Sequence, residues 1–294
     1  MSKVWLITGS SRGLGRELAK AVLAAGHHLV ATARTAGDLH DLVSQYGDRV
    51  RAVALDVMDP AAARAAIAVA TSAFGRLDVV VNNAGYANIN SIEDVADDDF
   101  HAQVDTNFFG VVNVTRAALP VLRAQRDGHI IQISSIGGRL GTPGLAAYQS
   151  AKFAVEGFSE VLSKEVGPLG IRVTIVEPGG MRTDWAGSSM HIDEIRDDYK
   201  ATVGGFAQMA RGNAGAGQSD PAKAAQAILR IASEKEPPLR LLLGSDAVFL
   251  AGVVVSARVA EDAKWKALSM STDCDGLVDF AETPIASALV AMRS

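Results

Sequence analysis

The sequence predicts an α/β protein in which helices cover both faces of a doubly wound, seven-stranded parallel sheet. Three observations predict this fold class. Short apolar runs alternate with helical stretches along most of the chain, turn residues separate them, and the runs lack the polar alternation of half-exposed strands. Of the 294 residues, 48% are hydrophobic, which excludes a disordered chain and supports a sizeable core. We expect one domain over residues 1–294.

Seven short apolar runs are the expected strands. They span residues 4–8, 29–33, 50–55, 77–81, 129–134, 171–176 and 239–243. A strand that is covered on both faces needs apolar side chains in both directions, and these runs have them. The carboxyl ends of such parallel strands meet at one edge of the sheet, where we expect the polar residues of the site.

Helical stretches lie between these strands. They are a stretch ending at residue 25, residues 37–46, 60–74, 97–125 and 145–166, and a last stretch that starts at Asp220-Pro221. Asp59-Pro60 predicts a helix start, because aspartate caps the first amides and proline suits the first helical position. Pro120 should kink the long helix, since it lacks an N–H and crowds the carbonyl of Arg116.

Charge, cysteine and histidine content restrict the partners. With 28 Lys plus Arg and 33 Asp plus Glu, the formal net charge of −5 argues against a nucleic-acid-binding protein. A single cysteine, Cys274, can form neither an internal disulfide nor a thiolate metal site, and the histidines lack ligand spacing, so we expect no metal.

The apolar runs also restrict the location of the protein. The longest one after the first strand, residues 247–257, is far shorter than the roughly 20 residues that cross a bilayer. The opening residues are apolar over too short a stretch for a signal peptide. We therefore expect a cytoplasmic protein with a small-molecule partner and neither nucleic acid nor membrane as partner.

The first chemical signal is a glycine-rich turn. Thr8-Gly9-x-x-x-Gly13-x-Gly15 lies between the first strand and its helix. Glycines let the backbone approach a pyrophosphate, and the helix N-terminus offers unpaired N–H groups and a partial positive charge. The alternative is an ordinary strand-to-helix turn. The strand before it and the helix after it favour a Rossmann-like dinucleotide site.

The end of the second strand bears on the choice of cofactor. NAD sites carry a carboxylate there for the ribose 2′-hydroxyl, but this chain continues with Arg34-Thr35. An arginine attracts a 2′-phosphate, and Arg12 in the glycine turn could supply a second cation. Both arginines could instead be solvated surface residues. The pattern predicts NADP(H).

Four polar residues form the second chemical signal. Tyr148 and Lys152 are four apart in a helical stretch and so share a face, Ser135 follows the fifth strand, and Asn107 lies in the long helix. Carbonyl reduction needs a proton donor, and an unperturbed tyrosine has a pKa of about 10. An ammonium about 4 Å away is worth roughly 4 kcal/mol, so we expect Lys152 to lower the pKa of Tyr148 before desolvation subtracts from the effect. Ser135 can donate a hydrogen bond to the oxygen on which negative charge grows.

Together these motifs resemble the short-chain dehydrogenase/reductase family, in its single-domain NAD(P)-binding branch. The matching segments are TGSSRGLG at 8–15, LDV at 55–57, NNAG at 82–85, Asn107, Ser135, YQSAK at 148–152 and PGGMRT at 178–183. They cover about the first 185 residues in the family's order. Ala33-Arg34 and the run YQSAKFAVEGFSE further resemble NADP-preferring bacterial 17β-hydroxysteroid-dehydrogenase-like reductases.

The resemblance implies catalytic roles. Tyr148 is implied to be the general acid in reduction and the base in oxidation, and Lys152 to lower its pKa and hold the nicotinamide ribose. Ser135 is implied to orient the carbonyl, and Asn107 to anchor a water that extends a proton relay. A homodimer or homotetramer is also implied, often through the helix that bears Tyr148.

The resemblance also implies a set of cofactor-binding residues. Asp56 and Val57 flank the adenine in this interpretation, and residues 178–183 cover the nicotinamide. The full set is Gly9, Ser11, Arg12, Gly13, Leu14, Gly15, Arg34, Thr35, Asp56, Val57, Asn83, Ala84, Gly85, Tyr148, Lys152, Pro178, Gly179, Met181 and Thr183.

The substrate region lies after these motifs. Residues 184–219 should form a lid, and residues 244–294 a C-terminal extension. The lid carries apolar side chains at Trp185, Met190, Ile192, Ile195, Phe206 and Met209. They favour a pocket for a hydrophobic ketone or secondary alcohol, although they could equally face the core. Tyr86, Arg139 and Trp185 are candidate substrate contacts.

These observations predict an NADP(H)-dependent carbonyl reductase or alcohol dehydrogenase. One alternative is a 3-oxoacyl-thioester reductase, but the residues after 243 fit the usually shorter members of that group poorly. Another is a catalytically idle NADP(H)-binding sensor. An epimerase or dehydratase is disfavoured, because such relatives usually have a different glycine spacing and a larger C-terminal domain.

Overall fold

A parallel sheet of seven strands forms the centre of the protein. The structure is a computed structural model that describes residues 2–183, 190–212 and 215–291. The strands are β1 (Val4–Ile7), β2 (His28–Ala33), β3 (Val50–Ala54), β4 (Val79–Asn82), β5 (Gly128–Ile133), β6 (Ile171–Pro178) and β7 (Arg240–Leu243). Their order is β3-β2-β1-β4-β5-β6-β7, and all neighbouring pairs are parallel. The predicted doubly wound sheet is confirmed, and its order reverses between β1 and β4, where such sheets bind ligands.

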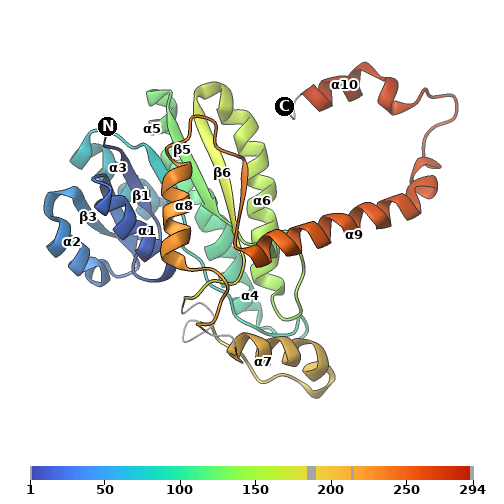
Figure 1. Cartoon of the computed structure of the whole chain (residues 1–294), viewed down its shortest axis with the longest axis horizontal. Coiled ribbons are helices and arrows are strands. Elements are labelled where there is room, and N and C mark those ends of the chain that lie inside the picture. Colours follow the sequence, from blue (N-terminus) through green and yellow to red (C-terminus); the bar gives the residue numbers. More distant parts are fainter. Residues whose placement is uncertain (1, 184–189, 213–214, 292–294) are drawn as a thin grey trace. The chain divides into compact units, whose positions relative to one another are not determined.

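Helices cover both faces of the sheet, as predicted (Figure 1). One face packs against α1 (Gly13–Ala24), α2 (His40–Tyr46) and α8 (Pro221–Ile231), and the other against α3 (Pro60–Phe74), α5 (Gly110–Gln125) and α6 (Ala146–Val166). In β1, Trp5 and Ile7 face the first core while Val4 and Leu6 face the second. Apolar side chains are buried on both faces, which explains why the strand sequences show no polar alternation.

The Asp-Pro helix starts are confirmed by their hydrogen bonds. The Asp59 carboxylate accepts from the amide of Ala61 at 2.7 Å, and Pro60 is the first residue of α3. Asp220 accepts from the amide of Ala222 at 2.8 Å and starts α8 in the same way. Each carboxylate satisfies a helix amide that has no partner within the helix.

The long helix expected over residues 97–125 is interrupted. It consists of α4 (Asp97–Val104), a π-helical turn over Asp105–Phe109, and α5. Pro120 lies inside α5, which continues on both sides of it, and the kink expected there stays a prediction. The π turn contains Asn107. Single π turns occur often at functional sites.

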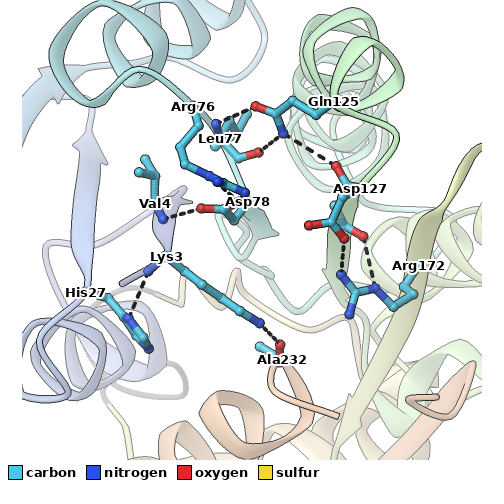
Figure 2. Close-up of polar contacts among 11 residues, drawn as sticks. Lys3, Val4, His27, Arg76, Leu77, Asp78, Gln125, Asp127, Arg172 and Ala232 are labelled. Carbon is cyan, nitrogen blue, oxygen red and sulfur yellow. Dashed lines mark hydrogen bonds and ion pairs between the residues drawn. The ribbon is translucent and has the colours of Figure 1, made fainter. Parts of the chain in front are cut away.

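The amino-terminal edge of the sheet carries a polar cluster (Figure 2). Asp78 accepts a hydrogen bond from the amide of Val4 at 2.7 Å and another from Arg76 Nε at 2.7 Å. The Lys3 ammonium donates to the carbonyl of Ala232. Gln125 bonds both backbone groups of Leu77, and Arg172 pairs with Asp127 at 2.7 Å. These contacts join the starts of β1, β4 and β6 to the ends of α5 and α8.

The contacts divide the chain into Met1–Phe249 and Leu250–Ser294. The second unit contains most of α9 (Ser245–Met270) and α10 (Pro284–Ala291). Among its described residues only Ala251 is buried, and large apolar side chains such as Val259 and Val278 are 63% and 69% exposed. None of the described helices combines the length and apolar character needed to cross a membrane.

Candidate active site

The glycine-rich turn forms a cradle at the amino end of α1. Gly9 and Gly13 have φ of +68° and +57°, values that favour glycine. A Cβ atom on Gly15 would overlap the carbonyl oxygen of Gly9. The first turn of α1 has no acidic residue, and Arg12 at its N-cap provides no side-chain cap. The first amides of α1, which have no partner within the helix, and the helix dipole can therefore bind phosphate groups, as a dinucleotide requires.

The loop after β4 is tied to this cradle. The Thr8 hydroxyl accepts hydrogen bonds from the amides of Asn83 and Ala84, at 2.9 and 3.0 Å. The Asn83 side chain donates back to the carbonyls of Thr8 and Gly9, at 3.0 and 3.2 Å. These bonds place the NNAG motif, including Gly85, beside the glycine turn.

Two further segments carry predicted cofactor residues at the ends of β2 and β3. Arg34 and Thr35 are exposed directly after β2, so no carboxylate stands at that strand end. Asp56 is exposed after β3, and its carboxylate accepts from the amide of Met58 at 2.9 Å. Val57 is buried instead, where it fills the space that Gly110 leaves open. Ser11 and Leu14 belong to the turn itself, and Leu14 is buried.

The loop after β6 reaches the glycine turn from the other side. Pro178 ends β6, and Gly179 donates from its amide to the carbonyl of Leu243 at 2.9 Å. Met181 forms an isolated β-bridge with Ser219. A Cβ atom on Gly13 would lie 3.7 Å from Cγ2 of Thr183. Thr183, one of the predicted cofactor residues of this loop, therefore lies against the cradle.

Tyr148, Ser135 and Lys152 are brought together. Tyr148 is hydrogen-bonded to Ser135, and the Lys152 ammonium lies 5.5 Å from the centre of the Tyr148 ring. Lys152 also donates to the carbonyl of Ile133 at 2.9 Å. The Ser135 hydroxyl accepts from the amide of Gly137 at 3.0 Å, which fixes its position at the end of β5. This is the geometry that the sequence predicted for the three residues.

The expected direction of the Tyr148 pKa is wrong for this structure. Burial raises the pKa of Tyr148 to about 12, and the hydrogen bond with Ser135 lowers it only in part. Burial also lowers the pKa of Lys152 to about 8. The cost of desolvating the phenolate therefore exceeds the attraction expected from the ammonium. The phenol keeps its proton at neutral pH, which is the form that a proton donor needs.

Asn107 contributes an unsatisfied oxygen to the same place. Its amide nitrogen donates to the carbonyls of Tyr86 and Gln103, both at 2.8 Å, while its Oδ1 is buried without a hydrogen-bond partner among the described residues. A Cβ atom on Gly85 would lie 2.5 Å from this oxygen and 3.6 Å from the Lys152 nitrogen. The oxygen and the ammonium thus border one gap, and a buried acceptor of this kind needs a donor.

The three candidate substrate residues are placed differently. Tyr86 is half-buried, and burial, aided by the negative charge of Asp99, raises its pKa. Arg139 forms a two-point ion pair with Glu177, at 2.8 and 2.6 Å, which occupies its guanidinium. Trp185 lies outside the described residues, as do residues 184–189 and 213–214 of the predicted lid.

An apolar cluster surrounds Tyr148. The buried members are Ala87, Ile89, Leu145, Tyr148, Met190, Val203 and Ala207, and Ile192, Ile195 and Phe206 pack against them. The lid segment joins this cluster through a backbone hydrogen bond from Ile89 to His191 at 2.9 Å. Four of the predicted lid residues, Met190, Ile192, Ile195 and Phe206, therefore meet the catalytic tyrosine candidate, whereas Met209 is exposed.

Two acidic residues of this region escaped the sequence analysis. Asp246 accepts from the amide of Gly180 at 2.6 Å and so holds the loop after β6. Glu177 pairs with Arg139 beneath the same loop. Each bond joins residues far apart in the chain, so only the Gly179-Gly180 pair, which leaves room for a carboxylate, gave a local signal.

Comparison with known proteins identifies the family. A family model described as short chain dehydrogenase matches residues 3–192. The chain belongs to the short-chain dehydrogenase/reductase family. An oxidoreductase from Botryotinia fuckeliana is 53% identical over 273 residues, 92% of this chain and 100% of that protein. The chain is thus an oxidoreductase of this family, whereas the finer resemblance to 17β-hydroxysteroid-dehydrogenase-like members stays a prediction.

Solved structures support the same assignment. A short-chain dehydrogenase from Streptomyces avermitilis has a TM-score of 0.86 and 40% identity, covering 93% of this chain and 100% of that one. An alcohol dehydrogenase from Thermococcus sibiricus, in complex with 5-hydroxy-NADP, has a TM-score of 0.68 and 26% identity, with 83% and 97% covered. A 3-ketoacyl-(acyl-carrier-protein) reductase from Brucella melitensis, in complex with NADH, has a TM-score of 0.69 and 26% identity. The match covers 82% of this chain and 96% of that one. Short-chain dehydrogenase/reductase relatives therefore bind either form of the nicotinamide cofactor.

Proposed function

We propose that this short-chain dehydrogenase/reductase transfers a hydride between NADP(H) and a carbonyl or secondary alcohol with apolar substituents. The observation that carries the proposal is the surroundings of the buried Tyr148. Its side chain is hydrogen-bonded to Ser135, and the Lys152 ammonium lies over its ring. All three residues lie at the edge of the sheet that holds the glycine turn. A phenol that is protonated at neutral pH, next to a second hydroxyl, suits a carbonyl oxygen that must gain a proton.

The side chains divide the proton chemistry among them. When bound, the nicotinamide cofactor supplies the hydride in reduction and accepts it in oxidation. Tyr148 gives its proton to the carbonyl oxygen in reduction, while Ser135 hydrogen-bonds that oxygen and holds it in place. Lys152 carries the positive charge that stabilises the resulting phenolate. Asn107 Oδ1 accepts a hydrogen bond from a water next to Lys152, through which the tyrosine regains its proton.

The choice of NADP(H) rests on the end of β2. Arg34 is exposed there and no carboxylate competes for the ribose, while Arg12 is exposed at the cradle. A 2′-phosphate gains charge-assisted hydrogen bonds from arginine, and the 2′-hydroxyl of NAD does not. The Thermococcus sibiricus relative in complex with 5-hydroxy-NADP supports this preference, and the Brucella melitensis relative with NADH makes a direct measurement necessary.

Arg34→Ala tests the cofactor preference. We expect the Kd for NADPH to rise by about ten- to 100-fold, because one to three kcal/mol of charge-assisted hydrogen bonding is lost, while the Kd for NADH stays unchanged. Fluorescence titration of both cofactors measures this, with Arg116→Ala, an exposed arginine of α5, as the matched control. Tighter binding of NADH than of NADPH by the natural chain would contradict the assignment.

The apolar cluster around Tyr148 supports a hydrophobic substrate. A panel of apolar ketones, secondary alcohols and 3-oxoacyl thioesters, followed by NADPH absorbance, tests the substrate class. Faster turnover of ketones than of thioesters supports the proposal. Preference for the thioesters would favour the second candidate, a 3-oxoacyl-thioester reductase, which the ketoacyl reductase among the relatives makes worth including. NADPH binding without any turnover would favour a sensor.

We also propose that the protein is a cytoplasmic homodimer or homotetramer with residues 184–219 as its lid and residues 244–294 as its extension. Support comes from the exposed apolar side chains of Leu250–Ser294, which a partner copy would shield from water. An exposed Cys274 fits a reducing compartment. Light scattering of the full chain measures the oligomeric state, and a monomer at micromolar concentration would contradict this part.

A further inference from the structure

A network of ion pairs links the elements that carry Ser135 and Tyr148. The Glu177 side chain is fully buried at the end of β6, and its carboxylate receives three hydrogen bonds. Arg139 donates to it at 2.8 and 2.6 Å, and Arg240, the first residue of β7, donates at 2.9 Å. The guanidinium groups of both arginines are thereby fixed in orientation, since each planar fork accepts few arrangements.

Arg240 extends this network to the catalytic helix. It pairs with Glu156, which is nearly buried, and with Glu160 at 3.0 Å. Glu156 follows Lys152 by four residues in α6, as Lys152 follows Tyr148, so the three side chains share one face of the helix. Arg240 therefore connects the helix of Tyr148 to Glu177.

Arg139 extends the network to the serine loop, by which we mean residues 134–139 after β5. It follows the short 3-10 turn Ile136–Gly138, which Ser135 caps, and its amide donates to the carbonyl of Ile136 at 2.9 Å. A Cβ atom on Gly138 would lie 2.9 Å from Cγ of Glu156. The serine loop and α6 therefore approach more closely than any side chain at 138 would allow, and Glu177 holds both.

We propose that Glu177, with Arg139 and Arg240, sets the position of Ser135 relative to Tyr148. Burying charges is costly, and apolar residues of similar size would fill the space at least as favourably. The ion pairs instead fix how the serine loop and α6 are oriented, because each hydrogen bond fixes a distance and an angle. Glu177, Arg139 and Arg240 are positioning residues, which act through the serine loop and α6. The inference rests on the proposed function for its kinetic readout, but has a second readout that needs no turnover.

Arg139→Gln in a double-mutant cycle with Ser135→Ala tests the kinetic part. We expect Arg139→Gln to lower kcat by about ten- to 100-fold, the cost of a misplaced catalytic group, with the KM for NADPH within about twofold. In the Ser135→Ala background the same change should lower kcat by less than about twofold, because the group that it positions is gone. Arg139→Lys, which keeps the charge but not the two-point pair, should recover part of the loss. Losses that multiply in the double variant would overturn the proposal.

Amide hydrogen exchange of the substrate-free protein is the second readout. In Arg139→Gln, or in Arg139→Lys if the former does not fold, the amides of residues 134–139 should exchange at least about tenfold faster, while those of β1 keep their rate. Unchanged exchange in the serine loop would overturn the proposal whether or not the protein turns over a ketone. Asp78→Asn is the matched control, a buried carboxylate of another arginine pair, which should leave both the serine loop and kcat unchanged.

Discussion

The polar side chains at the amino-terminal and carboxyl-terminal edges of the sheet differ in whether they have hydrogen-bond partners. At the amino-terminal edge the side chains of Figure 2 bond to other parts of the same chain, as Asp78 does to Val4 and Arg76. At the carboxyl-terminal edge Asn107 Oδ1 is buried without a hydrogen-bond partner in the described part of the chain, and Gly85 leaves the space beside it without a side chain. Polar groups that hydrogen-bond to one another stabilise a fold. A buried acceptor without a hydrogen-bond partner, next to a glycine, leaves room for a ligand or water to donate to it. Substitutions at the two edges should therefore have separable effects.

Tyr148→Phe should show the largest effect. We expect kcat to fall by roughly 10²- to 10⁴-fold, because the proton donor is lost, with the Kd for NADPH nearly unchanged. Steady-state kinetics and fluorescence titration measure the two quantities. Unchanged turnover would show that Tyr148 is not the proton donor. It would also contradict the assignment of the chemistry to the carboxyl-terminal edge of the sheet.

Gly15→Ala should damage the cradle. The new Cβ overlaps the carbonyl of Gly9, so the turn must shift, and we expect the Kd for NADPH to rise by more than about tenfold. Gly252→Ala, at a helical glycine of α9 with open space around it, is the control. Equal cofactor affinities in the two variants would show that the cradle does not bind the phosphates.

Asp78→Asn should weaken the fold and spare the chemistry. Loss of the charged partner of Arg76 and Val4 should lower the free energy of unfolding by about 1.5 to 3 kcal/mol, the usual range for hydrogen bonds to charged groups. Urea denaturation measures the loss, and kcat/KM under native conditions should stay within about twofold. A large fall in kcat/KM would contradict the view that the amino-terminal edge stabilises the fold without affecting the chemistry.

His129 should make stability depend on pH. Burial lowers its pKa from 6.5 to about 3 in the folded protein, so below about pH 6.5 the unfolded chain binds a proton that the folded chain does not. This contribution is complete above that pH and decreases as the pH falls toward 3, with a loss of about 2 kcal/mol by pH 5. His129→Gln, which keeps a donor for Thr174, should flatten this slope in urea titrations. An unchanged slope would assign the acid sensitivity to other groups.

Local patterns were enough to predict most of the fold and the meeting of three site residues. The strand runs, the Asp-Pro starts and the Tyr148–Lys152 spacing depend on neighbours in sequence, and the structure confirms these placements. The pKa of Tyr148 was predicted in the wrong direction, because its burial comes from lid residues such as Met190 and Val203, over 40 residues away. The ion pair of Arg139, a candidate substrate contact, could not be predicted from local residues, because its partner Glu177 lies beyond α6. The assigned roles of these residues stay predictions.

The π turn at Asp105–Phe109 has a consequence for the register of the helix that follows. A π turn accommodates one extra residue, so deleting Thr106 would let α4 and α5 run as one regular helix. Each residue of an α-helix turns the chain by about 100°, so the deletion would rotate α5 against everything upstream. Val114 and Ala118 could then no longer face the core while Gln103 of α4 kept its hydrogen bond with the amide of Asn88. The π turn therefore sets α4 and α5 at different rotations about one continuous axis, and the shortened chain should keep the core contacts of α5 or the polar contacts of α4, but not both.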